Sequence, residues 1–360
     1  MTMEKSDIPK KTTLILSSTV LFCVILIGIL YGLSAEHISY SQNFIRSFSD
    51  DKIKQTKVMV LGSDSHYIAG ITANHIYLGN TKDPLNLLVT STLLTDTQRV
   101  RITKENKDNE KLAEAYIQVD SPFFYIKDGS IPRLFRGGLN KWHAYPYMDH
   151  TPPFKQAVPI SSRSFVALAT IGAPEGNELK NILCKISLDS PFIQWSPELL
   201  ETKTEDYYTT NGILRYNSES NELVYTYFYC NQYLILDTSL QVVYKGQTID
   251  AVSHAKTKRV RVSKYIYALA SPASIVNRNS YVAGKWLYVH SNLMGRKESR
   301  RAFELASAID VYDLAAKEYK YSFYVPDFHG KKMESFRIVN NHLIALFGPY
   351  LVRYDMERSK

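Results

Sequence analysis

The pattern of hydrophobic and polar positions divides the chain into one long apolar segment and many short apolar runs. No residue from Leu14 to Leu33 is charged. At 1.5 Å per residue, a helix of this length spans roughly 30 Å, the thickness of a bilayer's hydrocarbon core. After this segment the apolar runs are only a few residues long and alternate with polar turns, which is typical of β-strands. The pattern predicts one transmembrane helix followed by an all-β domain.

The charges around the apolar segment predict its orientation. Lys5, Lys10 and Lys11 precede it, whereas the first basic residue after it is Arg46. By the positive-inside rule, the N-terminus is cytoplasmic and the rest of the chain lies in the periplasm or outside the cell. A cleaved signal peptide ending before Ala35 is the alternative, but its apolar region is usually only about 7–15 residues long. We therefore expect an uncleaved signal-anchor in the inner (cytoplasmic) membrane.

These boundaries divide the chain into four parts. We expect a short cytoplasmic tail over residues 1–13, a signal-anchor helix over 14–33, a linker over 34–56 and a folded domain over 57–360.

A pair of strands recurs along the predicted domain. The second strand of the pair ends in Asp in four copies, at Asp189, Asp237, Asp313 and Asp355, and has two weaker copies over 84–90 and 132–137. A β-rich run precedes each copy, over residues 76–78, 123–126, 165–168, 223–228, 286–289 and 343–346. Most of the turns before these runs contain Asn, Gly or Ser, residues common in tight hairpins. The repeat indicates six similar units.

The spacing of the repeat predicts the architecture. Neighbouring copies are 48 residues apart at Asp189 and Asp237 and 42 apart at Asp313 and Asp355, near the period of about 45 that is typical of a β-propeller blade. Insertions at 246–273 and 293–306 would explain the longer step between Asp237 and Asp313. We predict a six-bladed β-propeller with about four antiparallel strands per blade; a pair of β-sandwiches or a β-solenoid is the alternative. The last unit lacks an outer strand, which we expect residues 57–61 to supply.

Composition and cysteine usage agree with an exported β domain. Hydrophobic residues make up 45% of the chain and there are 26 tyrosines, which excludes a disordered or polytopic membrane protein. Cys184 and Cys230 are about one blade period apart and would occupy equivalent places in neighbouring blades. A disulfide needs Cα atoms within about 7 Å, so we expect no bridge between them.

The N-terminal anchor, the segment ITANHIYLGN (71–80) and the degenerate blades resemble the membrane-anchored, TolB-like six-bladed propellers of Bacteroidota. The resemblance covers most of residues 57–357. It implies a propeller fold and a location in the cell envelope. Because the matching motifs are structural, the resemblance implies no catalytic residue.

Motifs with specific chemistry are missing from the sequence. It contains no nucleophile elbow, phosphate loop, HExxH, paired CxxC or calcium loop. The segment Trp142–Thr151 contains His143, Asp149 and His150, which would bind a transition metal only if the loop folded back on itself. Their spacing fits no established site. We predict no metal and no cofactor, and the sequence identifies no catalytic residue.

Basic residues gather in the two proposed insertions, over residues 254–264 and at Arg296, Lys297, Arg300 and Arg301. Outside the membrane, anionic lipid headgroups, an acidic protein or solvent alone would face them, and nucleic acid is not an expected partner. We therefore predict a non-catalytic protein- or ligand-binding module of the cell envelope. The alternative is a propeller hydrolase or lyase, which the convergence of several His, Asp or Glu residues in the central funnel would favour.

Overall fold

The computed structural model describes residues 10–34, 43–49, 53–105, 112, 114–148, 151–172, 179–200, 206–255, 257, 259–262, 267–269 and 273–356. The chain forms two compact units, Met1–Tyr40 and Ser41–Lys360. The described part of the first unit is the helix α1 (Lys10–Ser34), whose large apolar side chains from Leu14 to Leu30 are exposed. In the part of the chain that the structure describes, we find no helix long and apolar enough to cross a membrane.

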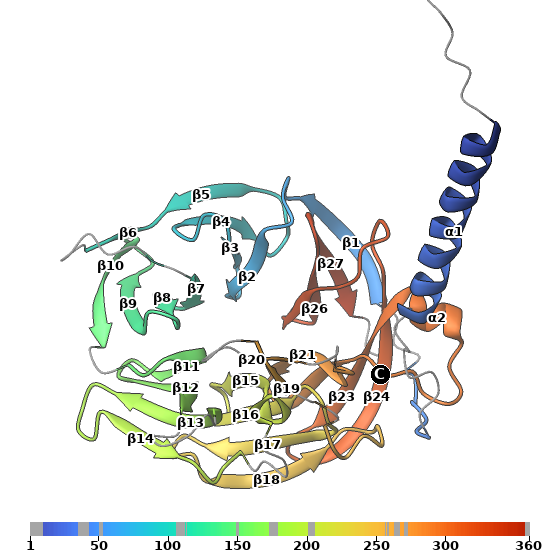
Figure 1. Cartoon of the computed structure of the whole chain (residues 1–360). Coiled ribbons are helices and arrows are strands. Elements are labelled where there is room, and N and C mark those ends of the chain that lie inside the picture. Colours follow the sequence, from blue (N-terminus) through green and yellow to red (C-terminus); the bar gives the residue numbers. More distant parts are fainter. Residues whose placement is uncertain are drawn as a thin grey trace, which may run out of the picture. The chain divides into compact units, whose positions relative to one another are not determined.

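The second unit is an all-β, six-bladed propeller, whose blades follow one another around a closed ring in Figure 1. The first three blades contain β2 (His66–Ile71), β3 (His75–Asn80), β4 (Asn86–Ser91) and β5 (Thr97–Arg101), then β7 (Ala115–Asp120), β8 (Phe123–Asp128), β9 (Arg133–Gly138) and β10 (His143–Met148), then β11 (Phe154–Ser161), β12 (Ser164–Gly172), β13 (Leu179–Ser187) and β14 (Ile193–Ser196). The fourth and fifth blades contain β15 (Gly212–Asn217), β16 (Glu222–Tyr227), β17 (Gln232–Asp237) and β18 (Val242–Gln247), then β21 (Asn277–Ala283), β22 (Trp286–Ser291), β23 (Ala306–Asp313) and β24 (Glu318–Pro326). A short strand, β6 (Thr103–Lys104), pairs with the outer edge of the second blade.

The sixth blade combines both ends of the propeller chain. β25 (Ser335–Val339), β26 (His342–Phe347) and β27 (Tyr350–Met356) form its inner part, and β1 (Ile53–Val60) pairs antiparallel with β27 as the outermost strand. The predicted closure of the ring is confirmed, with Val58 opposite Val352. β1 begins at Ile53, so the blade includes residues that the sequence assigned to the linker.

The sequence repeat corresponds to the two middle strands of each blade. The β-rich runs lie in β3, β8, β12, β16, β22 and β26, and the second strands of the repeat lie in β4, β9, β13, β17, β23 and β27. Because neighbouring blades cover both faces of these strands, most of their residues are buried, as in β23 and β26. The hairpin turns at Asn221, Gly284 and Asn341 have positive φ, as the sequence predicted.

Hydrophobic packing holds the blades together. Within the described residues, a hydrophobic core lies between every two neighbouring blades, including the sixth and the first. Cys184 and Cys230 are buried free thiols that pack in two different cores. The insertions contain the hairpin of β19 (Arg259–Arg261) and β20 (Tyr267–Leu269), the 3-10 helix η1 (Tyr207–Thr210) precedes β15, and the short helix α2 (Arg300–Glu304) precedes β23.

Residues 43–49, which we call the strap, lie against the outer edge of the fifth blade. Phe48 forms a parallel bridge with Ser322 of β24, and its ring stacks on Tyr324 at 4.7 Å between centroids. Phe44 is buried against Val276 and Leu293. This part of the predicted linker therefore belongs to the propeller unit.

Candidate functional site: the central channel

A large cavity, with a volume of about 1220 Å³, forms the channel along the propeller axis. The innermost strand of every blade contributes to its wall, namely β2, β7, β11, β15, β21 and β25. The described residues of the wall include no histidine, and their carboxylates are Glu114, Asp120 and Glu219. The wall is neither apolar nor rich in acid and base pairs. Its distinctive chemistry comes from partly buried cations.

Polar side chains connect each blade to the next one around the channel. We call Tyr67, Lys127, Gln156, Arg215, Asn279 and Arg337 the interblade ring. In blade order, the contacts are Ile117 N to Tyr67 OH at 2.6 Å, Lys127 Nζ to Ala157 O at 2.7 Å, Gln156 Nε2 to Gly212 O at 2.6 Å, Arg215 Nε to Ser280 O at 2.8 Å, Asn279 Nδ2 to Glu334 O at 3.5 Å and Arg337 Nη2 to Ile68 O at 3.3 Å. Every junction between blades thus has one of these contacts.

The ring lies at one level of the channel. Tyr67, Gln156, Arg215, Asn279 and Arg337 occupy the second to fourth positions of their innermost strands. Lys127 comes from β8, but its ammonium group donates to Gln118 of β7 at 2.6 Å and to Ala157 of β11. Because all innermost strands start at the same end of the channel, these positions lie within two residues, or about 7 Å, of one another in depth.

Cationic and neutral members alternate around the ring. Lys127, Arg215 and Arg337 belong to the second, fourth and sixth blades, whereas Tyr67, Gln156 and Asn279 belong to the first, third and fifth. None of the three cations forms an ion pair with a carboxylate among the described residues, and their recorded partners are carbonyl and amide oxygens. The three cations therefore have no ion-pair partner among the described residues, although Glu114, Asp120 and Glu219 line the same channel.

The pKa values of these groups reflect this environment. Burial lowers the pKa of Lys127 to about 7, and the positive charge of Arg215 contributes. Burial and the neighbouring Arg337 likewise lower the pKa of Arg215 to about 9, and burial lowers the pKa of Arg337. Desolvation and like charge both disfavour a cation. The two guanidinium groups nevertheless keep their charge at neutral pH.

The ring cations retain unused hydrogen-bond donors. A guanidinium has five N–H groups and an ammonium has three. Arg337 donates from Nη1 to its neighbour Phe336 and from Nη2 to Ile68, and its guanidinium lies 5.2 Å from the centre of the Tyr281 ring. Arg215 donates to Ser280, Leu214 and Asn279. Each of these side chains can therefore bind an additional acceptor in the channel.

A fourth cation, Lys155 on β11, also lines the channel. Its ammonium donates to Asn181 at 3.0 Å and Asn211 at 2.8 Å, and burial lowers its pKa to about 8. Burial raises the pKa of Asp120, the carboxyl group at the end of β7. Burial therefore disfavours the charged form of both side chains.

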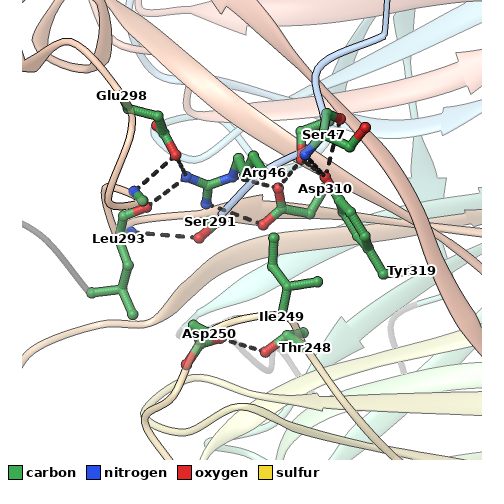
Figure 2. A network of polar contacts seen from close by, with 12 residues as sticks. Arg46, Ser47, Thr248, Ile249, Asp250, Ser291, Leu293, Glu298, Asp310 and Tyr319 are labelled. Carbon is green, nitrogen blue, oxygen red and sulfur yellow. Dashed lines mark hydrogen bonds and ion pairs between the residues drawn. The ribbon is translucent and has the colours of Figure 1, made fainter. Parts of the chain in front are cut away.

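A second buried polar cluster lies at the strap and is shown in Figure 2. Arg46 donates from Nε to Asp310 at 2.6 Å and from Nη1 to Glu298 at 2.5 Å, and its two partners also bind protein donors. Ser322 donates to Asp310 at 2.5 Å, and Tyr324 donates to Glu298 at 2.5 Å. Although burial alone would lower the pKa of Arg46, the two carboxylates raise it above its usual value. This cluster is closed, because protein groups satisfy its charges.

The residues that the sequence singled out lie away from the channel. His143 is on the outer strand of the second blade, where its Nδ1 is 2.8 Å from the hydroxyl of Thr103. Asp149 and His150 lie outside the described residues, and no group of three metal-ligating side chains is found among the residues that are described. Lys256, Lys258 and Lys264 are also outside the described residues. Arg296, Lys297, Arg300 and Arg301 are exposed beside the strap, where Arg296 N donates to Phe44 O.

Comparison with known proteins supports the fold. No protein-family model matches the chain, and no curated protein matches it. Among solved structures, a member of the DUF4221 family from Bacteroides vulgatus is similar, with 12% identity, a TM-score of 0.52 and coverage of 88% of this chain and 99% of that one. Virginiamycin B lyase from Staphylococcus aureus shows 9% identity and a TM-score of 0.46, covering 85% and 99% of the two chains. YCF48 bound to a D1 peptide shows 8% identity and a TM-score of 0.49, covering 86% and 99%. The Bacteroides structure supports the six-bladed propeller fold, and the TolB-like grouping remains a prediction.

Proposed function

We propose that the protein is a membrane-anchored, extracytoplasmic propeller that binds a ligand in its central channel without converting it. The observation that carries this proposal is the interblade ring, whose three cations line an open cavity of about 1220 Å³ and have more N–H groups than their described contacts use. Binding cavities for small ligands are commonly concave sites with a few convergent polar groups. Because all six blades form the wall, the channel is a rigid frame that requires little reorganisation to bind.

The hydrolase or lyase alternative has less support from the channel. Such reactions commonly use a general acid and base within hydrogen-bond reach of the reacting atoms. Lys127, with a pKa near 7, is the group that favours the alternative. Its ammonium group, however, donates to Gln118 and Ala157. No described histidine or carboxylate lies in hydrogen-bond contact with it.

A co-purification experiment tests the binding proposal. The full chain would be extracted from its native membrane in mild detergent and analysed by native mass spectrometry before and after partial denaturation. We expect a small molecule or peptide that stays bound to the folded chain and is released when the chain unfolds. The released ligand should have the same mass and covalent structure as the ligand that was bound. The captured ligand would then be incubated with fresh protein. Its conversion into a chemically different compound would contradict the non-catalytic proposal. Extraction of Arg163→Gln, an exposed arginine outside the channel, provides the control for non-specific charge effects.

We also propose that α1 anchors the propeller in the inner membrane, with the propeller in the periplasm or outside the cell. The proposal is supported by the uncharged segment from Leu14 to Leu33 and by the exposed apolar side chains of α1. A reporter that requires export, fused after Lys360, should be active. Activity of a cytoplasm-dependent reporter at the same position would contradict this topology.

The exposed basic residues beside the strap are a candidate contact site for a partner in or near the membrane. Arg296, Lys297, Arg300 and Arg301 are exposed, and Arg296 contacts the strap, which follows α1 in sequence. Basic residues near a membrane attract anionic headgroups or an acidic protein surface. Affinity purification of the solubilised chain with mass spectrometry of co-purifying proteins tests for such a partner. Loss of a recovered protein in Arg296→Glu would locate the contact at this cluster.

A further inference from the structure

We infer that the interblade ring binds a tetrahedral oxyanion, namely a phosphoryl or sulfuryl group of the channel's ligand. This inference rests on the proposed binding function and specifies the chemistry of its ligand. The group would lie at the channel axis, between Lys127, Arg215 and Arg337.

The first argument is that the three cations are not needed to connect the blades. At the other three junctions, neutral side chains make the same type of contact, from Tyr67, Gln156 and Asn279. A neutral donor to a carbonyl has no charge to desolvate, whereas a buried cation without a counter-charge is costly. The contact between blades therefore does not explain the positive charge, and a ligand with negative charge does.

The second argument is the arrangement of the three cations. They come from alternate blades at one level of a ring, which gives an approximately threefold arrangement around the channel. Two neighbouring pairs are near enough to interact, because the charge of Arg215 lowers the pKa of Lys127 and the charge of Arg337 lowers the pKa of Arg215. A phosphoryl or sulfuryl group presents three terminal oxygens around one axis. A carboxylate has two oxygens and matches two cations only.

The third argument is the chemistry of the available donors. Guanidinium groups bind phosphate through charge-assisted hydrogen bonds, and lysine does so as a point charge. Arg215 and Arg337 each keep unused N–H groups after their contacts with the blades. Tyr116, Tyr216 and Tyr281 line the same channel and provide aromatic surface for the rest of the ligand. The wall thus combines an oxyanion site with a surface for an organic group.

Calorimetric titration of the detergent-solubilised full chain tests this inference. Sodium phosphate, sulfate, acetate and glycerol 3-phosphate would be titrated at pH 7, with chloride adjusted to keep the ionic strength constant. We expect phosphate and sulfate to bind at least tenfold more tightly than acetate, because one more oxygen receives a charge-assisted hydrogen bond. Equal affinity for acetate, or no binding of either tetrahedral anion, would overturn the inference. Tighter binding of glycerol 3-phosphate than of phosphate would identify a phosphate ester as the ligand, and equal binding would identify the free anion; both support the site.

Substitutions locate the site within the channel. Arg215→Gln and Arg337→Gln resemble the neutral contact that Gln156 makes, and each should weaken phosphate binding about tenfold or more. Arg163→Gln, which makes the same change in charge on the surface, should bind phosphate like the unmodified chain. Where a glutamine variant does not fold, Arg215→Lys keeps the charge but loses the planar fork, and it should weaken binding several-fold. Unchanged affinity in a folded ring variant would overturn the inference.

The outcomes separate this inference from the proposed function. If a ligand co-purifies with the chain and persists in Arg215→Gln and Arg337→Gln, the binding function stands and the oxyanion site is wrong. If phosphate binds at the ring but no ligand co-purifies under any extraction condition, the oxyanion site stands. The proposal that the chain holds a ligand in its native membrane is then wrong.

Discussion

Two arginine environments in the same propeller, one buried and one partly buried, differ in how their charge is neutralised. Arg46 of the strap contacts Asp310 and Glu298, and the two carboxylates raise its pKa. Arg215 of the channel contacts carbonyl and amide oxygens, and burial lowers its pKa to about 9. The same side chain is thus part of a completed ion cluster at the edge of the fifth blade and an uncompensated cation in the channel. The difference indicates a structural role for the first and a ligand-binding role for the second.

The two environments also predict different responses to mutation. Removing one member of a buried ion cluster leaves the remaining charge without a partner, which is strongly destabilising. Removing an uncompensated cation eliminates its desolvation cost and its repulsion of neighbouring cations, and only weak contacts with neutral acceptors are lost. Stability measurements can therefore separate the roles without knowledge of the ligand.

The largest expected effect is that of Arg46→Met. The substitution leaves Asp310 and Glu298 buried without their cation, and we expect the free energy of unfolding to fall by about 3–5 kcal/mol. Urea denaturation of the detergent-solubilised full chain, followed by tryptophan fluorescence, would measure it. Arg163→Met is the matched control, because its ion pair with Asp189 is exposed to solvent and should contribute little to stability. Equal losses in the two variants would contradict a structural role for the strap cluster.

Neutralising the partners of Arg46 should recover part of this loss. In Arg46→Met, the additional changes Asp310→Asn and Glu298→Gln remove the unpaired charges, and Ser322 and Tyr324 can still donate to the new amides. We expect the triple variant to be about 1–3 kcal/mol more stable than Arg46→Met alone. The same urea denaturation compares the two variants. No recovery would mean that the loss comes from the packing of the arginine side chain against Phe44 and not from unpaired charge.

The middle strands of the blades could be predicted from the sequence because both of their faces are buried. Such strands need apolar residues at nearly every position, so they recur as recognisable runs such as 165–168 and 343–346. The closing strand could be predicted because the last unit lacked a partner for Val352. Burial by neighbouring blades thus produces a repeated signal in the sequence even where the individual residues differ.

The channel site could not be predicted in this way. Five of its six residues lie on innermost strands, one face of which borders the cavity, and the ring uses six positions with five residue types. Tyr67, Gln156 and Arg337 share no motif, since each needs only a donor or acceptor that reaches the next blade. The strap was equally hidden, because Arg46 and Asp310 are 264 residues apart. The segment around His143, which looked more promising in sequence, lies on an outer strand instead.

Smaller losses of stability are expected for the channel arginines. Arg215→Gln and Arg337→Gln should each change the free energy of unfolding by no more than about 1 kcal/mol without added anion, because a glutamine can still connect two blades and a net hydrogen bond contributes about that amount. In saturating phosphate the unmodified chain should gain stability, whereas the variants should gain less. Urea denaturation with and without phosphate measures both effects. If either channel variant lost as much stability in phosphate-free buffer as Arg46→Met, the channel arginines would be structural, like Arg46, and the contrast between the two environments would be wrong.

The smallest effect is expected from titration of Lys127, whose pKa burial and the Arg215 charge lower to about 7. Between pH 6 and pH 8 this ammonium loses most of its charge, while the two guanidinium groups of the ring stay charged. Sulfate keeps its charge over the same range, so a change in its affinity reports the protein. We expect the affinity for sulfate to fall about threefold from pH 6 to pH 8, because the site loses one partly screened positive charge. Calorimetric titration measures it, and Lys127→Gln should show no such change.

The same group should affect stability in the opposite direction. An unfolded lysine keeps its proton up to a pKa of about 10.4, whereas folded Lys127 releases it near pH 7. From pH 7 to pH 10 the unfolded chain therefore binds more protons, and the anion-free protein should become more stable relative to Lys127→Gln as the pH rises. Sulfate should make this rise slightly smaller, since it binds better to the charged ammonium. If sulfate affinity and anion-free stability rose together with pH, Lys127 would not be the titrating group. The contrast between the ion-paired cation at the strap and the cations without ion pairs in the channel would then rest on the arginines alone.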